Sequence, residues 1–501
     1  DGIDATANGV GGSTNAQITN NHILGTGDGD PAIAAGVGIP LSGYGILMNN
    51  VANSNFTVSG NTVTNTAAGG IIAAVGLAPG GGSNATITGN TLINIGVALT
   101  NATIAALGGN FPAGTAIGTP GNCVVSGNTI MGVKAGVGIG STGTNDQITD
   151  NVIRGVSGDF GSGIAIWLTG GSTLISGNTI SNVSGLFGDG IALLVPNCEV
   201  RNNEISNVLG GNGIRLYDTE TIIIAGGVGN AGNQLIAGNT IANVTNGVGI
   251  ALYDQDNNEV TGNTVTNTGR DGILLYAVGG NTICVGPPVA GRNLGFTAPA
   301  TANNNEVIGN TIVGAATQAA DVAAVAPVRS QRYAAILLEG EADNNIVDNN
   351  TIENAGSASY AVGIDILAGG GGIPDNNDVI NNTLSGFTTV APGAGTSEGI
   401  RVLSGRNNAV VGNTVTNSGN LQYGIDIRTT NELPVTNNTV IGMLKAGLCL
   451  WGGTVANPLD VRGNTLTDNV HGINMVTGAA EITNKNVITG GAVGLYVDPM
   501  A

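Results

Sequence analysis

The stretch VTGNTV at residues 260–265 decides the fold, because copies of it recur as VIGNTI (307–312), VDNNTI (347–352) and VINNTL (379–384). Each copy reads apolar-x-Gly/Asn/Asp-Asn-Thr-apolar, and its apolar and polar side chains alternate as in a short strand. The Asn of this unit occurs sixteen times, at Asn21, Asn61, Asn90, Asn128, Asn151, Asn178, Asn203, Asn239, Asn263, Asn310, Asn350, Asn382, Asn413, Asn438, Asn464 and Asn486. The interval averages about 31 residues and varies from 22 to 47, which predicts stacked rungs of fixed strands joined by loops of variable length.

A second strand of the form Gly-Ile-x-Leu-x lies between successive copies of the Asn unit. Its copies are GIAIW (163–167), GIALL (190–194), GIRLY (213–217), GIALY (249–253), GILLY (272–276), GIDIL (363–367), GIRVL (399–403), GIDIR (424–428) and GLCLW (447–451). The Ile and Leu share one face of the strand and the x residues share the other. Because such a small unit cannot bury its own apolar face, the copies must stack. We therefore predict an all-β protein, a parallel β-helix (solenoid) of about sixteen rungs.

The same periodicity predicts what the polar residues of each rung do. In a parallel coil the repeated Asn residues lie above one another, so their side-chain amides can hydrogen-bond along the stack. Clusters such as DNNEV at 256 and NNNEV at 303 are expected to form the turns before the Asn strand.

Composition narrows the class of protein further. Gly accounts for 86 of the 501 residues, charged residues for only 9%, and the net charge is -19 with three Lys. Nucleic acid and anionic membranes are poor partners for such a chain, because binding phosphate groups requires clustered cations. No stretch has the roughly 18 consecutive apolar residues of a membrane span. We expect no membrane span and one repetitive domain over residues 1–501.

Taken together, these repeats resemble the right-handed parallel β-helix of the pectate-lyase-like superfamily, and more narrowly its carbohydrate-binding and sugar-hydrolase type of repeat. Residues 221–241 and 281–293 resemble the longer rung variant of large bacterial surface proteins. The resemblance covers the whole chain and implies a right-handed solenoid. It says less about function, since relatives include lyases, hydrolases, epimerases, phage tailspikes and plain surface stalks.

The register of the repeat indicates whether the four cysteines can form disulfides. Cys123 and Cys198 each lie five residues before a repeated Asn, three rungs apart. At about 4.8 Å per rung their Cα atoms are roughly 14 Å apart, too far for a disulfide. With Cys284 and Cys449 placed elsewhere in their rungs, we expect four free cysteines and no metal-ligand spacing.

Both ends of the chain stop on a Gly-Ile type strand without a capping helix, so we expect a chain cut from a longer protein or capped by a partner.

The x positions of the Gly-Ile-x-Leu-x strands are expected to form two columns that face outward. Charged and aromatic side chains gather there between Arg215 and Trp451, whereas both are scarce elsewhere. The ligand-binding candidates on this face are Arg215, Tyr217, Tyr253, Tyr276, Arg428 and Trp451. Three Tyr in successive rungs fit a sugar-stacking platform or a ladder that only stiffens the sheet. Two loop excursions, 285–303 and 314–332, are placed where they could wall a cleft.

Outward leucines on the same face need a cover. Leu274, Leu337, Leu367 and Leu403 occupy x positions, and we expect them to be covered by the chain's own loops or by another subunit. A homo-oligomer, such as a trimeric tailspike, is one form that this cover could take.

The catalytic candidates are Glu339, Asp365 and Asp426 with Arg401. A glycosidase needs two carboxylates about 5 to 9.5 Å apart, and Asp365 and Asp426 are two rungs, roughly 9.6 Å, apart. The same order also describes an Asp-Arg-Asp ion ladder, in which Arg401 lowers the pKa of both acids. A lyase or epimerase would instead use Arg401, Arg428 or Tyr423 as its base.

Calcium is the one metal that the sequence suggests, and no cofactor is required. DQDNNE at 254 starts like a calcium loop, but the sixth position holds Glu259 where an EF-hand has Gly. Asp254 and Asp256 remain candidates, with Asp218 and Glu220 in the neighbouring rung.

Three classes of function fit these observations. An extracellular structural or adhesive β-helix, with copies of itself or a polysaccharide as partner, is favoured by the low charge and the lack of a clean catalytic set. A polysaccharide hydrolase, lyase or epimerase acting on the Arg215–Trp451 face is the alternative, and a non-catalytic glycan-binding module is the third. All three place the chain outside the reducing cytoplasm, in the extracellular space or at a cell or virion surface.

Overall fold

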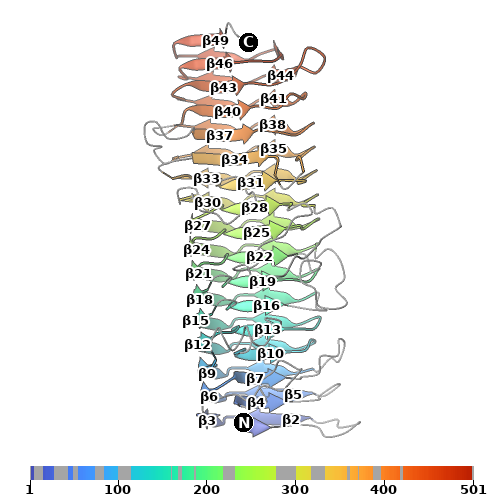
Figure 1. The fold of residues 1–501 in the computed structure, drawn as a ribbon, viewed down its shortest axis with the longest axis vertical. Helices are drawn as coiled ribbons and strands as arrows, with labels where there is room; N and C mark the ends of the chain where they lie inside the picture. The colour runs from blue at the N-terminus through green and yellow to red at the C-terminus, as the bar shows by residue number, and fades with distance from the viewer. Residues whose placement is uncertain are drawn as a thin grey trace, which may run out of the picture. The chain divides into compact units, whose positions relative to one another are not determined.

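The computed structural model describes residues 2–4, 15–26, 43–48, 55–73, 84–99, 114–158, 161–166, 172–185, 188–217, 232–277, 301–317, 333–357, 361–369, 372–387, 397–417 and 421–498. These residues form β-strands, turns and bends, and none of them lies in a helix. Contacts divide the chain into two compact units, Asp1–Gly247 (unit 1) and Val248–Ala501 (unit 2). Each unit is a right-handed parallel β-helix with three sheets, A, B and C, as the repeats predicted (Figure 1).

In unit 1 each rung contributes one strand to each sheet. Sheet A contains β1 (Ile3–Asp4), β4 (Tyr44–Met48), β7 (Gly69–Ala73), β10 (Ile117–Thr119), β13 (Ile139–Ser141), β16 (Ile164–Ile166), β19 (Ile191–Leu193) and β22 (Ile214–Tyr217). Sheet B contains β2 (Ala16–Thr19), β5 (Phe56–Ser59), β8 (Thr86–Thr88), β11 (Val124–Ser126), β14 (Gln147–Thr149), β17 (Leu174–Ser176), β20 (Glu199–Arg201) and β23 (Leu235–Ala237). Sheet C contains β3 (His22–Leu24), β6 (Thr62–Thr66), β9 (Thr91–Ile95), β12 (Thr129–Lys134), β15 (Val152–Ser157), β18 (Thr179–Ser184), β21 (Glu204–Leu209) and β24 (Thr240–Thr245).

Unit 2 repeats this arrangement. Its sheet A contains β25 (Ile250–Tyr253), β28 (Ile273–Tyr276), β31 (Ile336–Glu339), β34 (Ala361–Leu367), β37 (Ser397–Val402), β40 (Tyr423–Ile427), β43 (Ala446–Leu450), β46 (His471–Met475) and β49 (Val493–Val497). Sheet B contains β26 (Glu259–Thr261), β29 (Glu306–Ile308), β32 (Ile346–Asp348), β35 (Asp378–Ile380), β38 (Ala409–Val411), β41 (Pro434–Thr436), β44 (Leu459–Arg462) and β47 (Ala480–Thr483). Sheet C contains β27 (Thr264–Thr268), β30 (Thr311–Val313), β33 (Thr351–Glu353), β36 (Thr383–Ser385), β39 (Thr414–Thr416), β42 (Thr439–Ile441), β45 (Thr465–Thr467) and β48 (Val487–Thr489).

The Gly-Ile-x-Leu-x repeat forms sheet A, with parallel strands in exact register. Ile250 pairs with Ile273, which pairs with Ile336, so the repeated Ile residues stack toward the interior of the coil. Glycine precedes the Ile because the next rung passes very close: a Cβ added to Gly272 would lie 2.6 Å from the main-chain oxygen of Ala335. The repeat therefore records both the buried face of the strand and the tight corner that leads into it.

The sixteen repeated Asn residues lie at the corner between sheets B and C and form the predicted ladder within each unit. The main-chain N–H and the Nδ2 of Asn310 both donate to Oδ1 of Asn350, at 2.9 and 3.0 Å. Asn350 in turn donates both groups to Oδ1 of Asn382, and its Nδ2 also donates to the carbonyl of Val307 at 2.8 Å. These side chains are almost completely buried, so each rung satisfies the polar groups of its neighbour.

A second ladder in unit 2 refines the prediction for the Asn-rich turns. In DNNEV at 256, Asn257 makes the turn with φ of 58°, while Asn258 points inward and donates from Nδ2 to Oδ1 of Asn305 at 2.8 Å. Asn305, Asn345, Asn377 and Asn408 continue this buried row. The sequence marks these clusters as turns, but it does not separate the turn Asn from the ladder Asn.

The cysteines follow the prediction where they are described. Cys123, Cys198 and Cys449 are free and buried, whereas Cys284 lies outside the described residues. Cys123 and Cys198 occupy, in unit 1, the same place relative to the repeated Asn as Asn258 does in unit 2. The main-chain N–H of Cys123 donates to Asp146 at 2.7 Å, and that of Cys198 donates to Oε1 of Gln234 at 2.8 Å.

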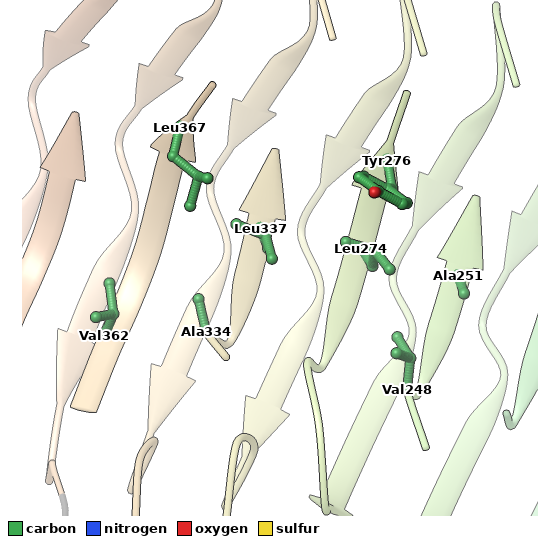
Figure 2. Close-up of a cluster of buried hydrophobic side chains, with 8 residues drawn as sticks. All are labelled: Val248, Ala251, Leu274, Tyr276, Ala334, Leu337, Val362 and Leu367. Atoms are coloured by element: carbon green, nitrogen blue, oxygen red, sulfur yellow. The ribbon is translucent and has the colours of Figure 1, made fainter. Parts of the chain in front are cut away.

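The x positions of sheet A are not exposed columns in most rungs, which corrects the expectation from the sequence. A buried apolar cluster lines this side of unit 2 (Figure 2), and it consists of Val248, Ala251, Leu274, Tyr276, Ala334, Leu337, Val362 and Leu367. Leu403 packs against the cluster and is partly buried. Since the burial arises within a single chain, these leucines give no support to an oligomer. The predicted excursions lie mostly outside the described residues, which include 301–303 and 314–317 of them.

No helix long and apolar enough to cross a membrane occurs in the described part of the chain.

Replacing Asn350 with Ala is expected to destabilise the protein by about 2 to 4 kcal/mol, because the buried main-chain N–H and Nδ2 of Asn310 lose their acceptor. The carbonyl of Val307 and Oδ1 of Asn382 each also lose the Nδ2 donor, although Oδ1 of Asn382 keeps the main-chain N–H of residue 350. The neighbouring Thr351→Val keeps a β-branched side chain at a half-buried strand position and should change stability by no more than about 0.5 kcal/mol. Chemical denaturation of the two variants checks this. Equal effects would show that the ladder contributes nothing beyond the strand itself.

Candidate functional site

Charged side chains gather at x positions of sheet A in unit 2, next to the apolar cluster. Asp365 of β34, Arg401 of β37, Asp426 of β40 and Cys449 of β43 are in register, so they form one column across four strands. All four are buried. Burial of a charge is tolerated only when the charge is paired, so the contacts of this column decide its chemistry.

Arg401 is the centre of the column and is completely buried. Its Nε donates to Oδ1 of Asp365 at 2.9 Å, and its Nη2 donates to Oδ2 of the same carboxylate. Its Nη1 lies 3.9 Å from Oε2 of Glu398, which is also fully buried. The two-pronged contact with Asp365 is the geometry in which a guanidinium group binds a carboxylate most strongly.

Asp426 is held by a different arginine. Nε and Nη2 of Arg428 donate to its Oδ2 at 2.8 and 2.6 Å, and Nη2 of Arg428 also lies 3.7 Å from Oε1 of Glu398. Burial raises the pKa of Asp426, and it outweighs the hydrogen bond from Arg428 and the positive charges of both arginines. The sequence predicted that Arg401 would lower the pKa of Asp426, and its positive charge does so, but desolvation is the larger effect and the net shift is upward.

Arg428 connects the buried charges to solvent. Its side chain is about one-third exposed, and its guanidinium carbon lies 5.3 Å from the ring centroid of Trp451. Trp451 is 38% exposed, while its Nε1 donates to Sγ of Cys449 at 3.1 Å. Burial and the nearby Asp426 raise the pKa of the Cys449 thiol to about 12, so this cysteine stays protonated and is a poor nucleophile.

Three more aromatic rings lie on the same side of strands β40 to β49. Tyr423 is in register with Ala446 and His471, and Lys445 Nζ lies 5.2 Å from the Tyr423 ring. His471 stacks on Tyr496 with ring centroids 4.8 Å apart, and Tyr496 is 39% exposed. We call Tyr423, Trp451, His471 and Tyr496 the aromatic platform.

The structure brings Asp365, Arg401 and Asp426 together, as three of the four predicted catalytic residues. The fourth, Glu339, lies in β31, the strand that pairs with β34. Glu339 is fully buried and in register with Tyr276 and Leu367, two apolar-cluster residues. The main chain of Gly369 lies against it, since a Cβ there would be 2.5 Å from Cγ of Glu339. All four side chains are buried. Catalytic roles for Glu339, Asp365, Asp426 and Arg401 stay predictions.

The predicted Tyr platform is less accessible than the sequence suggested. Tyr276 is buried, and Tyr253 meets it edge to face with centroids 6.2 Å apart and planes at 78°. This geometry fits the ladder that stiffens the sheet better than a surface for sugars. The side chains of Tyr217 and Trp167 lie outside the described residues.

Arg215 belongs to a separate buried pair in unit 1. It forms an ion pair with Asp189, which also accepts a hydrogen bond from the N–H of Asn212 at 2.8 Å. Burial raises the pKa of Asp189 to about 6, because desolvation outweighs the attraction of Arg215. The pair is internal, so it offers no exposed cation to a ligand.

Asp256, one of the two calcium candidates, already makes structural hydrogen bonds with both carboxylate oxygens. Oδ1 of Asp256 accepts the N–H of Asn303 at 2.6 Å, and Oδ2 accepts the hydroxyl of Thr301 at 3.0 Å. No group of three His, Cys, Asp or Glu side chains that could hold a metal ion occurs among the described residues. Asp218 and Glu220 lie outside them, so calcium binding near Asp254 and Asp256 stays a prediction.

Sequence reasoning missed Glu398, the residue that joins the two arginines. A signal was available, because an acidic residue precedes Gly-Ile at Asp189, Asp271 and Glu398 alike. His471 and Tyr496 were not among the predicted site residues either. The register of β46 with β49 is what brings these two rings together.

Comparisons with known proteins agree with the fold. A family model described as a right-handed β-helix region matches residues 300–488, and one described as periplasmic copper-binding protein (NosD) matches residues 190–326. No curated protein matches the sequence. The predicted resemblance to β-helix proteins of the pectate-lyase-like type is thus confirmed for the fold.

Solved structures similar to this chain are β-helix proteins with distant sequences. A GH136 lacto-N-biosidase from Eubacterium ramulus is 11% identical with a TM-score of 0.40, over 72% of this chain and 62% of that one. The A-module of a mannuronan C-5 epimerase from Azotobacter vinelandii is 12% identical with a TM-score of 0.39, over 89% and 91%. A tailspike protein of the E. coli bacteriophage HK620 is 12% identical with a TM-score of 0.45, over 96% and 74%. This chain thus spans less than two thirds of the first of these proteins.

The copper-binding description does not fit the residues found here. Copper prefers imidazole, thiolate and thioether ligands, and residues 190–326 contain no His. Cys198 is buried with its pKa raised to about 11 by burial, and Cys284 lies outside the described residues. We therefore derive no copper chemistry for this chain.

Replacing Arg401 with Ala should destabilise the protein by about 3 to 5 kcal/mol, because two buried carboxylates, Asp365 and Glu398, lose a cation. Arg406 is the matched control: it pairs with Asp375 at 2.9 Å, but its side chain is 68% exposed. Arg406→Ala should change stability by no more than about 1 kcal/mol. Denaturant unfolding measures both, and similar small losses would contradict the buried network.

Proposed function

We propose that this protein is a rigid surface β-helix that binds carbohydrate on the aromatic platform of Tyr423, Trp451, His471 and Tyr496. One observation carries the proposal: two exposed rings, Trp451 and Tyr496, and two partly exposed ones, Tyr423 and His471, lie on one side of strands β40 to β49, in a chain with only 3% aromatic residues. Aromatic faces stack on the apolar faces of sugar rings, and polar groups at the edges bind the hydroxyls.

The surroundings of Trp451 support stacking as its role. Its single hydrogen-bond donor is already used by Cys449 Sγ, so the exposed part of the side chain is an apolar surface. Arg428 lies over the ring and is fixed by Asp426, which holds the indole in place. A ring that is fixed before the ligand arrives loses little conformational entropy on binding.

The scaffold part of the proposal rests on the ladders and on the buried charges. Within each unit, successive rungs are joined by asparagine hydrogen bonds, and the carboxylates of the charged column are withdrawn from solvent. Such a chain suits a stalk or an adhesive surface, with polysaccharide or further copies of the chain as partners. We place it outside the cytoplasm, at a cell or virion surface, and the periplasmic description of the family model that matches residues 190–326 supports that location.

A second candidate function is hydrolysis of a glycan, and Asp426 favours it. Its raised pKa is what a general acid needs, and Arg428 Nη2 bridges it to a second carboxylate, Glu398. The bridge keeps the two carboxylates close enough for an acid and nucleophile pair. Against this reading, both carboxylates are buried, so a substrate would have to displace Arg428.

Trp451→Ala should weaken glycan binding at least about tenfold, the equivalent of about 1.4 kcal/mol, because it removes one of the two exposed rings of the platform. Trp451→Phe should retain most of the affinity, since a flat apolar face remains. Val455→Ala, at a residue that is 96% exposed, is the neutral control. Binding to a panel of oligosaccharides, followed by calorimetry, measures the effect. Equal binding by Trp451→Ala and the unaltered chain would refute the proposal.

If the second candidate is correct, the protein releases reducing ends from a glycan, and Asp426→Asn abolishes the release. The rate should fall as the pH rises through the raised pKa of Asp426, because the protonated carboxyl is the active form. Absence of product with every glycan that binds would leave binding as the function.

A further inference from the structure

We propose that Asp146 makes one corner of unit 1 sensitive to pH: the corner stays closed while the Asp146 carboxyl is protonated and loosens once that carboxyl ionises. The corner consists of residues 119–123 and 141–146, which connect sheet A to sheet B in two successive rungs. We call these residues the Asp146 corner. The corner belongs to unit 1 and the aromatic platform to unit 2, so this proposal goes beyond the proposed function and does not depend on it.

Asp146 occupies the place that a ladder asparagine occupies in unit 2. It lies five residues before a repeated Asn, as Asn258 does. Its Oδ1 accepts the main-chain N–H of Cys123 at 2.7 Å, just as Oδ1 of Asn305 accepts that of Asn258 at 3.0 Å. The carboxyl therefore takes the structural role of an amide, but unlike an amide it can gain or lose a proton.

All the groups that hold the Asp146 carboxyl are neutral. The hydroxyls of Thr119 and Ser141 both donate to its Oδ2, the first at 2.8 Å, and Cys123 supplies a main-chain N–H to Oδ1. No arginine, lysine or histidine side chain pairs with Asp146 in the part of the chain that the structure describes. The carboxylates of the charged column in unit 2, by contrast, each face an arginine.

Burial without a cation favours the neutral form of this carboxyl. Asp146 is only 1% exposed, and an ionised carboxylate in such surroundings costs far more free energy than a neutral, hydrogen-bonded one. Desolvation accordingly raises the pKa of Asp146, although the hydrogen bonds from Ser141, from the N–H of Cys123 and from Thr119 lower it. Both hydroxyl oxygens can accept as well as donate, so the protonated carboxyl keeps its contacts.

Two thiols are the other titratable groups near this carboxyl within the described residues. Cys198 lies two positions further along the same row, beyond Thr173, and burial raises the pKa of its thiol to about 11, with the charge of Asp146 adding to the rise. The Cys123 thiol donates to the carbonyl of Gly121 at 3.2 Å, and thiols ordinarily titrate only near pH 8.5, by the usual value of about 8.5. A change in the corner between about pH 4 and pH 7 therefore reports the ionisation of Asp146.

Ionisation loosens the corner because the closed form binds the proton more tightly than an open form does. In an open corner the carboxyl reaches water, where its pKa returns to about 3.9. The raised pKa of the closed form means that the stabilisation is complete below about pH 4 and is lost as the pH rises through that raised value. A Cβ on Gly143 would collide with the carbonyl oxygen of Pro120, so the two turns are packed backbone against backbone and should open together.

Hydrogen exchange of the whole chain tests the proposal, with mass spectrometry of peptides that cover residues 117–126 and 139–149. After correction for the intrinsic exchange rates, both segments should open at least about tenfold more readily at pH 7 than at pH 4. Asp146→Asn keeps an acceptor for the N–H of Cys123 but cannot ionise, so its opening should change by less than about twofold over this range. Asp189, whose pKa is also raised, lies two rungs further along, and peptides that cover residues 188–193 report its titration separately.

Asp150→Asn is the matched control, because it removes the same charge from the exposed turn between β14 and β15. This variant should retain the pH dependence of the unaltered chain. Equal opening of the unaltered chain at pH 4 and pH 7 would overturn the proposal, and so would an Asp146→Asn variant with undiminished pH dependence.

Ser141→Ala tests the corner by a second route, which does not require the Asp146 variant to fold. It removes a hydrogen bond that lowers the pKa of Asp146, so the loss of protection should become larger and extend to higher pH. A pH dependence that Ser141→Ala leaves unchanged would count against Asp146 as the titrating group.

Discussion

Within each unit, successive rungs depend on one interaction, the pair of hydrogen bonds that a buried Asn donates to Oδ1 of the Asn in the next rung. Because these side chains are almost fully buried, a rung that slips out of register leaves several polar groups without partners, at a cost of about 1 to 3 kcal/mol for each. The ladder thus fixes where each rung sits. It puts no limit on the chain between two Asn residues, which explains why the interval varies from 22 to 47 residues.

Burial on both sides of sheet A is the second constraint. The Ile and Leu of each strand face the interior of the coil, and the x residues of most rungs are buried as well. A strand with two buried faces can hold a charge only if a partner lies on the same face, and register supplies it: Asp365, Arg401 and Asp426 follow one another in successive strands. Glu398 completes the set from a neighbouring position, so that each arginine meets two carboxylates.

The candidate site arises where this burial ends. Cys449 is fully buried, Asn474 in the next strand is half-buried, and Tyr496 in the last strand is exposed, although all three continue the same column. Trp451 follows Cys449 by two residues and is exposed, whereas Cys449 is buried. The aromatic platform therefore borders the buried ion network, and Arg428 belongs to both. At this border, the buried ion network lies next to aromatic rings that can stack on a ligand.

The sequence by itself determined the fold, the ladder and the state of the described cysteines. Those features depend on period and register: a repeated Asn must align with its copies, and Cys123 and Cys198 must lie three rungs apart. Tertiary structure decided which x residues reach solvent, that Asp426 pairs with Arg428 instead of Arg401, and that His471 meets Tyr496. The physical reason is that alternation along a strand shows which side chains share a face. It contains no information about what covers that face, and burial of the face sets the pKa and the pairing of every charge on it.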